Sequence, residues 1–360
     1  MDRRIFMAYG DDAKDMTLSL MEAADIKERV PKNATIALKP NLVVARKPEG
    51  GATTHGDVLE GVIIYMQKHG FKDISIIEGS WVGDRTERAF QVCGYDEIGR
   101  KYGVPLYDLK KDSYIKVKTA IGDMPISKRA MDANYLINLP VLKGHCQTIM
   151  TCALKNCKGC ISDPEKRRFH TMGLHKPIAA LAAVLKPELT IVDSICGDLD
   201  FEEGGTPVQT NRMYLGEDMV QLDALGCRLM GIPVGDVSYI ALAEKYGAGS
   251  ADLRDEDIIS INEAESANWQ AKPTGVVARL TRGVTADQAC SACYGNLVHA
   301  LHRLEGRLPS KPGSIVIGQG FKGKNPDGFG IGSCCSGAND FVKGCPPSAE
   351  AIIEALRRFE

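Results

Sequence analysis

Short apolar runs alternate with amphipathic stretches along the first two-thirds of the chain. The runs that predict buried strands are residues 4–8, 35–39, 73–78, 135–139 and 189–193. The stretches with apolar residues at helical spacing, which predict helices, are residues 57–69, 84–92 and 178–185. Strands and helices in alternation predict an α/β fold with a mixed or mainly parallel sheet and helices on both faces.

The pattern weakens into a polar connection at residues 265–274, which we interpret as a domain boundary. Beyond it, the sequence predicts a helix over 287–304, a strand over 314–317 and a helix over 348–358. We therefore expect an α/β domain over residues 1–268 and a small C-terminal α/β module over residues 269–360.

Charge and hydropathy narrow the classes of partner. The 360 residues include 44 Lys+Arg and 46 Asp+Glu, a net charge of −2, so no overall attraction to nucleic acid is expected. The apolar stretches are too short to span a bilayer and the first residues lack a signal-peptide core, so we expect a cytoplasmic protein without a membrane partner. P-loop, G-x-S-x-G and H-E-x-x-H motifs are missing, which leaves the common nucleotide, serine-hydrolase and zinc-protease sites without support.

Twelve cysteines are the unusual feature of the composition. In a reducing compartment, clustered cysteines indicate metal or redox chemistry more often than disulfides. The C-terminal module contains a C-x2-C pair and two distant cysteines, in glycine- and proline-rich settings: Cys290, Cys293, Cys334 and Cys345. Because structural zinc usually takes two short cysteine pairs, we predict that these four bind a 4Fe-4S cluster. Zinc and unligated thiols are the alternatives, and Cys335 competes with Cys334.

A second group of polar residues follows the strand predicted at 135–139. Lys143 and His145 lie on the turn, and Thr148, Thr151 and Lys155 follow at a spacing that predicts one face of a helix. Ligands of α/β sheets bind where parallel strands end, and this group offers donors and positive charge. We therefore predict a pocket for a small anion here, opening toward the cluster. A solvated basic helix end is the alternative.

Other residues are expected at the same edge of the sheet. Lys39 and Asn41 end the strand at 35–39, and His55 precedes the next helix, so we expect all three to bind substrate together with Thr148. The glycine-containing turn at 203–207 is expected to close over a ligand.

Roles within this pocket follow from charge and acidity. Since an unperturbed histidine has a pKa of about 6.5, we assign acid/base chemistry to His145, with Lys143 and Lys155 as charge clamps. A further set of thiols includes a second C-x2-C pair, which indicates either another metal site or, more simply, core thiols: Cys146, Cys152, Cys157 and Cys160.

These motifs resemble a known family. N-L-P-V-L-K-G-H…T-C-A-L-K-N-C-K-G-C-I at 138–161, K-P-N-L at 39–42, T-T-H at 53–55 and P-E-L-T-I-V-D at 187–193 resemble the family of domain of unknown function 362. The resemblance covers roughly residues 34–250 and implies association with iron-sulfur ligands, though the ferredoxin repeats typical of the family are missing here. G-C-P-P at 344–347 is similar to the cluster-binding pattern in small subunits of nickel-iron hydrogenases and complex I.

The function we expect is that of an anaerobic iron-sulfur enzyme, an oxidoreductase or lyase. It would act on a small anionic metabolite by electron transfer or by Lewis-acid chemistry at the cluster. Two alternatives stay open: a ferredoxin-like electron carrier that docks a partner protein, and a binding protein with a structural metal. The partners expected are the anion, an electron-transfer protein and a second copy of the chain in a homodimer.

Overall fold

The computed structural model describes residues 2–263, 272–304 and 313–359. The chain divides into two compact units, each described here by itself. Unit 1 comprises Met1–Lys166 and Ile178–Lys272, and unit 2 comprises Arg167–Pro177 and Pro273–Glu360. The domain boundary predicted near residue 268 lies outside the described residues.

Unit 1 is built on an eight-stranded sheet with the order β12-β1-β11-β10-β7-β2-β3-β4. Its strands are β1 (Ile5–Tyr9), β2 (Ile36–Pro40), β3 (Ile74–Glu78), β4 (Leu106–Asp108), β7 (Tyr135–Leu139), β10 (Leu189–Asp198), β11 (Pro207–Gly216) and β12 (Ile258–Ser260). Only β11 runs antiparallel to its neighbours in this sheet, as described. The parallel strands therefore end along one edge, which we call the carboxyl edge.

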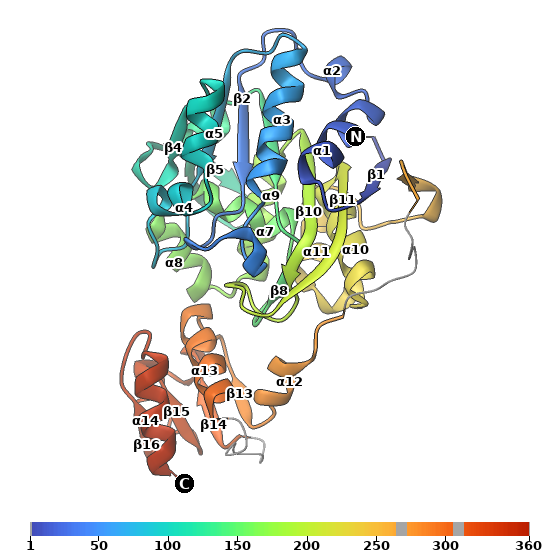
Figure 1. The fold of residues 1–360 in the computed structure, drawn as a ribbon. Helices are drawn as coiled ribbons and strands as arrows, with labels where there is room; N and C mark the ends of the chain where they lie inside the picture. Colours follow the sequence, from blue (N-terminus) through green and yellow to red (C-terminus); the bar gives the residue numbers. More distant parts are fainter. Residues whose placement is uncertain (1, 264–271, 305–312, 360) are drawn as a thin grey trace. The chain divides into compact units, whose positions relative to one another are not determined.

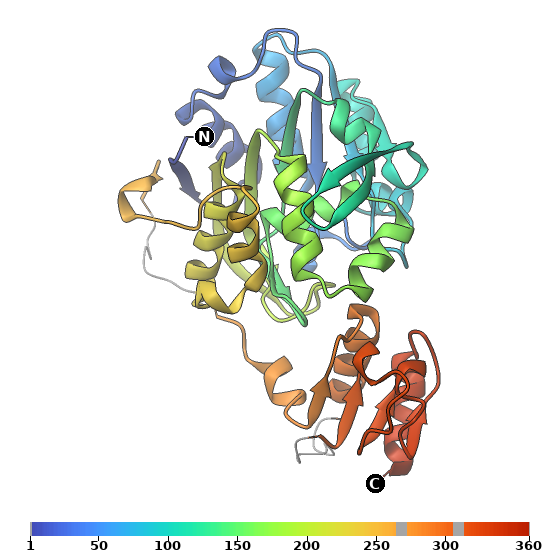
Figure 2. The same cartoon turned by 180° about the vertical axis from the view of Figure 1, so that it is seen from behind.

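Helices cover both faces of this sheet. On the face toward the viewer in Figure 1 lie α1 (Ala13–Ala23) and α3 (Gly56–Lys68). On the opposite face, in front in Figure 2, lie α9 (His175–Leu185) and α10 (Met219–Met230), coloured green and yellow. Leu20 of α1 and Val62 of α3 pack on strand residues such as Leu38 in a continuous buried core. The predicted α/β class, with a mixed sheet and helices on both faces, is confirmed.

Shorter elements complete unit 1. The helices are α2 (Ile26–Arg29), α4 (Thr86–Val92), α5 (Tyr95–Tyr102), α6 (Lys128–Asp132), α7 (Ala153–Asn156) and α11 (Ser238–Lys245). Helix α8 (Asp163–Thr171) begins in unit 1 and ends in unit 2. The 3-10 turns are η1 (Pro48–Gly50), η2 (Leu109–Lys111), η3 (Cys157–Cys160), η4 (Val234–Asp236) and η5 (Asp255–Asp257). Two separate hairpins pair β5 (Tyr114–Thr119) with β6 (Gly122–Ser127), and β8 (Lys143–His145) with β9 (Ile149–Thr151).

The β8–β9 hairpin corrects the helix predicted after β7. Lys143 pairs with Thr151 across the hairpin, so Thr148 and Thr151 do not share a helix face with Lys155. The turn is closed by a side chain, because the imidazole Nδ1 of His145 accepts the backbone N–H groups of residues 147 and 148, each at 3.0 Å. A side chain that bonds nearby backbone offers the chain an alternative to a helical turn.

Unit 2 is a small α/β module, as predicted. Its four-stranded sheet is parallel throughout and comprises β13 (Val284–Ala286), β14 (Ile315–Ile317), β15 (Phe329–Ile331) and β16 (Asp340–Val342). Its helices and turns are α12 (Val276–Leu280), α13 (Ser291–Arg303), α14 (Ala349–Phe359), η6 (Gln319–Phe321) and η7 (Ser333–Cys335). Buried Leu297 and Leu301 of α13 and Ile352 of α14 contribute to its core.

No helix among the described residues has both the length and the apolar composition needed to cross a bilayer.

Candidate functional site

Five lysines gather at the carboxyl edge of unit 1, and we call them the lysine cluster: Lys39, Lys143, Lys155, Lys158 and Lys166. Lys39, near the end of β2, forms an ion pair of 2.6 Å with Glu78, the last residue of β3. The two side chains are 1% and 4% exposed, so this pair is neutralised inside the protein. Gly159 of η3 permits it, because a Cβ there would lie 2.7 Å from Lys39 Nζ.

Lys143 is buried without a bound carboxylate. Its Nζ donates to the backbone carbonyls of Ala52 and Glu202 and lies 3.4 Å from Oδ1 of Asn41. Burial lowers the pKa of Lys143 to about 7, although the nearby charge of Glu202 opposes this. The amine is therefore partly deprotonated near neutral pH, and a nearby anion would favour its protonated form.

Glu202 joins two of the predicted catalytic residues. Its Oε2 lies 2.8 Å from His145 Nε2, and its Oε1 lies 2.5 Å from Lys155 Nζ. Burial raises the pKa of Glu202, but the charge of Lys155 and the hydrogen bond from His145 outweigh it and hold that pKa well below its usual range. Glu202 is therefore an ionised carboxylate held by two donors.

The acid/base role predicted for His145 needs correction. Its Nδ1 accepts two backbone N–H groups, so the ring proton lies on Nε2, which donates to Glu202. Burial lowers the pKa of His145 to about 4, and the charge of Lys155 acts in the same direction. His145 is thus a neutral donor near neutrality.

The last two members of the lysine cluster differ in their partners. Lys166 donates to the carbonyls of Gly79 and Ser80, each at 2.9 Å, and lies 3.3 Å from an oxygen of Asp163. Lys158 is half-buried and, among the described residues, its Nζ has no hydrogen bond or ion pair. Burial, followed by repulsion from Lys155, lowers the pKa of Lys158 to about 7. Among the described residues, neither Lys143 nor Lys158 is paired directly with a carboxylate, and burial leaves both amines partly deprotonated near neutral pH.

His55 occupies the position before α3. Its ring Nδ1 and its backbone nitrogen each lie 2.8 Å from Oδ2 of Asp193, which is buried in β10. Burial lowers the pKa of His55, but the Asp193 carboxylate outweighs this and raises it to about 8. His55 rather than His145 therefore titrates near neutrality.

The remaining predicted residues have structural partners. Asn41 contacts Lys143, and the hydroxyl of Thr148 donates to the carbonyl of Met150 at 3.1 Å. The sequence interpretation missed Glu202, Lys158 and Asp193. Asp193 and Lys158 had a signal, since each lies in one of the motifs quoted above, P-E-L-T-I-V-D and N-C-K-G-C.

The thiols of the second C-x2-C set lie in the core. Cys152 Sγ is 3.5 Å from the hydroxyl of Tyr214, and Cys157 Sγ is 3.7 Å from Met219 Sδ. Burial raises the pKa of Cys146 and of Cys160 to about 12, so these two thiols stay protonated at neutral pH. Their environment favours core packing over metal binding.

In unit 2, the predicted cluster ligands follow the ends of parallel strands. Cys290 and Cys293 come after β13 at the start of α13, Cys334 follows β15, and Cys345 follows β16. Burial raises the pKa of Cys293 to about 12, and Cys290, Cys345 and Cys334 raise it further, so the four thiols are electrostatic neighbours. Gln319, after β14, places Nε2 3.2 Å from Cys290 Sγ.

Cys334 and Cys335 lie in different environments. Cys335 is buried, and its thiol lies 3.5 Å from the carbonyl oxygen of Val316, inside the module. Cys334 is partly exposed. Its charge contributes to the raised pKa of both Cys290 and Cys293, so its thiol lies near theirs. This geometry favours Cys334 as the ligand. Among the described residues, no three His, Cys, Asp or Glu side chains are grouped closely enough to hold one metal ion.

The four cysteines have surroundings that suit a 4Fe-4S cluster. Four thiols, an amide N–H directed at one of the sulfurs, and a helix N-terminus are features that stabilise a negatively charged cluster. Gly332 has a φ of +86° and lies against the site, since a Cβ there would be 3.7 Å from Cys293 Sγ.

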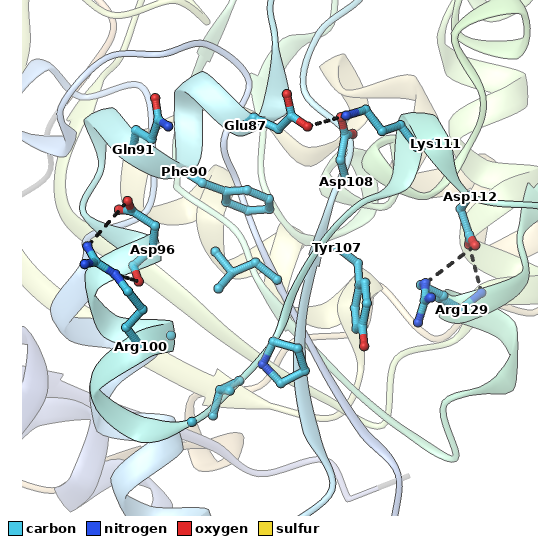
Figure 3. A pocket seen from close by; sticks show the side chains of 15 residues that line it. Glu87, Phe90, Gln91, Asp96, Arg100, Tyr107, Asp108, Lys111, Asp112 and Arg129 are labelled. Atoms are coloured by element: carbon cyan, nitrogen blue, oxygen red, sulfur yellow. Dashed lines mark hydrogen bonds and ion pairs between the residues drawn. The ribbon is translucent and has the colours of Figure 1, made fainter.

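A separate hollow of about 810 Å³ lies beside the edge strand β4 (Figure 3). Charged pairs border it, including Asp96 with Arg100 and Asp112 with Arg129, whose guanidinium lies 3.6 Å from the centre of the Tyr107 ring. None of the predicted site residues lines this hollow. Three of its four carboxylates are paired with a basic residue of the same lining.

Comparisons with known proteins place this geometry in context. The sequence model of a family described as "Domain of unknown function (DUF362)" matches residues 36–228, which carry the whole lysine cluster. A thylakoid-associated protein of Synechocystis sp. is 26% identical over 223 residues, which cover 59% of this chain and 68% of that protein. The lactate racemase apoprotein of Thermoanaerobacterium thermosaccharolyticum is similar with a TM-score of 0.43 and 14% identity, over 64% of this chain and 59% of the racemase. The matched part thus spans less than two-thirds of the racemase.

Proposed function

We propose a function for this chain from its own two sites. The chain belongs to the family of the domain of unknown function DUF362. In this proposal it is an iron-sulfur enzyme, with a 4Fe-4S cluster in unit 2 and a binding site for a small anionic metabolite at the lysine cluster of unit 1. The family description names no chemistry, so the argument rests on the residues of this chain.

The cluster assignment rests on one observation about unit 2. Cys290, Cys293, Cys334 and Cys345 come from three loops, all of which follow carboxyl ends of strands in one parallel sheet. Such loops converge at one edge, where α/β proteins hold ligands. When bound, the cluster supplies one-electron transfer, or Lewis-acid activation if one iron is open to substrate. The residues around it hold the sulfurs and donate hydrogen bonds to them.

The anion site rests on two lysines without a direct carboxylate partner. Lys39, Lys155 and Lys166 each contact a carboxylate, whereas Lys143 and Lys158 contact none in the described part of the chain. A small anion would give Lys158 a hydrogen-bond acceptor, and its charge would favour the protonated form of both amines, which burial opposes. His55, oriented by Asp193, would hold or move a proton at Nε2 near neutral pH.

Burial favours a small molecule over a partner protein as the ligand. Lys39, Lys143 and Lys155 are buried, so they cannot form the exposed basic surface that docks an electron-transfer partner. The ferredoxin-like carrier is therefore the weaker alternative.

Anaerobic purification of the full chain, with iron and acid-labile sulfide assays, tests the cluster. We expect brown protein with broad absorbance near 400 nm, and loss of most iron in Cys345→Ser and Cys334→Ser. Cys335→Ala is the matched control, because its buried thiol is not a proposed ligand, and it should keep the cluster. Colourless zinc-containing protein would support the structural-metal alternative. Iron lost from Cys335→Ala but retained in Cys334→Ser would reverse the ligand choice.

A further inference from the structure

We propose that the anion site of unit 1 is a carboxylate site, and that the side chain of Glu202 occupies it until the carboxylate of a substrate displaces it. This inference rests on the proposed anion site at the lysine cluster and specifies its ligand. It assigns the loop between β10 and β11 as the element that carries the internal ligand.

The donors around Glu202 form a prepared site. His145 Nε2 and Lys155 Nζ come from different elements, β8 and α7, and each binds a different oxygen of the carboxylate. Their side chains are 2% and 3% exposed, whereas Glu202 is 27% exposed. The donors are thus part of the interior, and the carboxylate reaches them from outside.

The direction of the His145 donor does not depend on Glu202. Because its Nδ1 accepts the N–H groups of Gln147 and Thr148, the ring stays oriented and keeps its proton on Nε2. Lys155 is held on α7 beside it. A carboxylate from another molecule would meet the same two donors at the same spacing.

The loop that carries Glu202 is anchored at its base. Oxygens of Asp198 accept the N–H groups of Asp200, Phe201 and Thr206, which ties together the residues on either side of the loop tip. Figure 1 shows this loop at the carboxyl edge beside β8. Gly144, between Lys143 and His145, lets the loop approach, because a Cβ there would lie 2.1 Å from the carbonyl oxygen of Leu199.

The main chain at the tip of the loop is held by contacts that do not involve the Glu202 carboxylate. Arg46 and Lys143 donate to carbonyls of the tip, and the N–H of Gly205 donates to the carbonyl of Gly50 at 3.2 Å. Gly204 and Gly205 follow with φ of +73° and +137°, where other residues would be strained. Withdrawal of the Glu202 side chain therefore leaves the base of the loop in place.

The chemistry of the donors favours a carboxylate over a phosphate. One lysine and one neutral N–H match two oxygens with a single negative charge, and no third donor contacts the Glu202 carboxylate among the described residues. Lys158 has no hydrogen-bond partner among the described residues. A substrate with a carboxylate and a second oxygen acceptor could satisfy Lys158 as well, which gives it an advantage over Glu202.

Chemical rescue of a truncated side chain tests this inference. In Glu202→Ala we expect a lower Tm than in wild type, and a saturable rise in Tm with acetate. We expect acetate to bind this variant about tenfold more tightly than wild type, because the competing internal carboxylate is gone. Phosphate at matched ionic strength should not reproduce the rise.

Three variants serve as controls. Glu203→Ala changes the neighbouring residue of the same loop and should respond to acetate no more strongly than wild type. Glu202→Gln keeps the space filled, so it should fold even if Glu202→Ala does not, and it should bind acetate less tightly than Glu202→Ala. Lys155→Met added to Glu202→Ala should abolish the rescue.

Wild-type protein provides a second measurement that needs no variant. Malonate, a carboxylate with a second acceptor, should increase amide hydrogen exchange in residues 199–206 as it displaces Glu202. Rescue of Glu202→Ala by phosphate but not by acetate would overturn the carboxylate assignment and leave the anion site standing. If acetate, phosphate and malonate all fail to bind, the anion site itself is overturned. Iron content of the same samples reports on the cluster independently.

Discussion

Asp193 binds His55 through a single oxygen: Oδ2 accepts both the backbone N–H of His55 and its ring Nδ1–H, each at 2.8 Å. Asp193 is wholly buried, whereas the His55 side chain is 17% exposed. The other ring nitrogen, Nε2, has no hydrogen bond recorded within the described part of the chain. The pair therefore fixes one side of the imidazole and leaves the other available for proton exchange.

This pair predicts a pH dependence of stability. The pKa of His55 is raised from 6.5 to about 8 in the folded chain, so its protonated form stabilises the fold. That contribution is fully present below pH 6.5 and disappears as the pH rises through about 8. We expect Asp193→Asn to cost about 2 kcal/mol more in unfolding free energy below this window than above it. Urea unfolding on both sides of the window measures the difference.

Direct titration of the His55 ring by NMR provides the check. In Asp193→Asn the pKa of His55 should fall below 6.5, because burial then acts without an opposing charge. His55→Gln should remove the pH-dependent difference. A pKa of His55 that stays near 8 in Asp193→Asn would show that another group raises it.

Apolar periodicity accounts for much of unit 1. The runs at 35–39, 73–78 and 135–139 are buried on both faces of the sheet, so they contain almost no polar interruption and lie at β2, β3 and β7. Strand β11 gives no such signal, because its first five residues are at least partly exposed. Strands β15 and β16, of three residues each, are too short for a period to appear.

The candidate site could be predicted only in part. Lys143, His145 and Lys155 were expected at the carboxyl edge because they follow the end of a buried strand. Glu202 could not be expected there, since it lies 47 residues from Lys155 and reaches it only through the path of the β10–β11 loop. The hairpin at residues 143–151 likewise depends on a side-chain bond from His145 that has no signature in the sequence.

A glycine in the C-K-G-C segment should be indispensable for stability. In Gly159→Ala the new Cβ would lie 2.4 Å from Oε1 of Glu78 and 2.7 Å from Nζ of Lys39. The buried ion pair would have to separate, so we expect a loss of about 2–4 kcal/mol in urea unfolding. Gly235→Ala is the control, because a Cβ there meets nothing within 4 Å, and it should change stability by less than about 0.5 kcal/mol. A small effect at Gly159 would mean that the ion pair can shift freely.

Lys143 should make stability rise at alkaline pH. Its pKa is lowered from 10.5 to about 7 by burial, so the unfolded chain binds more protons than the folded chain between these values. The free energy of unfolding of Lys143→Met, relative to wild type, should be most favourable at or below pH 7. This advantage should shrink by roughly 3–5 kcal/mol toward pH 10.5. Unfolding free energies across this range give the measurement. Lys68→Met, on the exposed surface of α3, is the control for loss of a lysine side chain, and a difference at Lys143 that does not change with pH would contradict its buried state.

Gln319 should tune the chemistry of Cys290. Its Nε2 lies 3.2 Å from Cys290 Sγ, and this hydrogen bond lowers the thiol pKa against the larger effect of burial, which raises it. In the cluster-free chain, Gln319→Leu should therefore raise the pKa of Cys290 and slow its alkylation by iodoacetamide at neutral pH.

The same substitution should also act on the loaded protein. Hydrogen bonds to ligating sulfur stabilise the reduced, more negative state of a cluster, so Gln319→Leu should make the reduction potential more negative. Gln319→Glu should shift it further in the same direction, because a carboxylate adds negative charge beside the sulfur. Redox titration followed by EPR spectroscopy gives both values. If neither substitution moves the potential although Cys290→Ser loses the cluster, Cys290 is a ligand but Gln319 does not donate to it in the loaded protein.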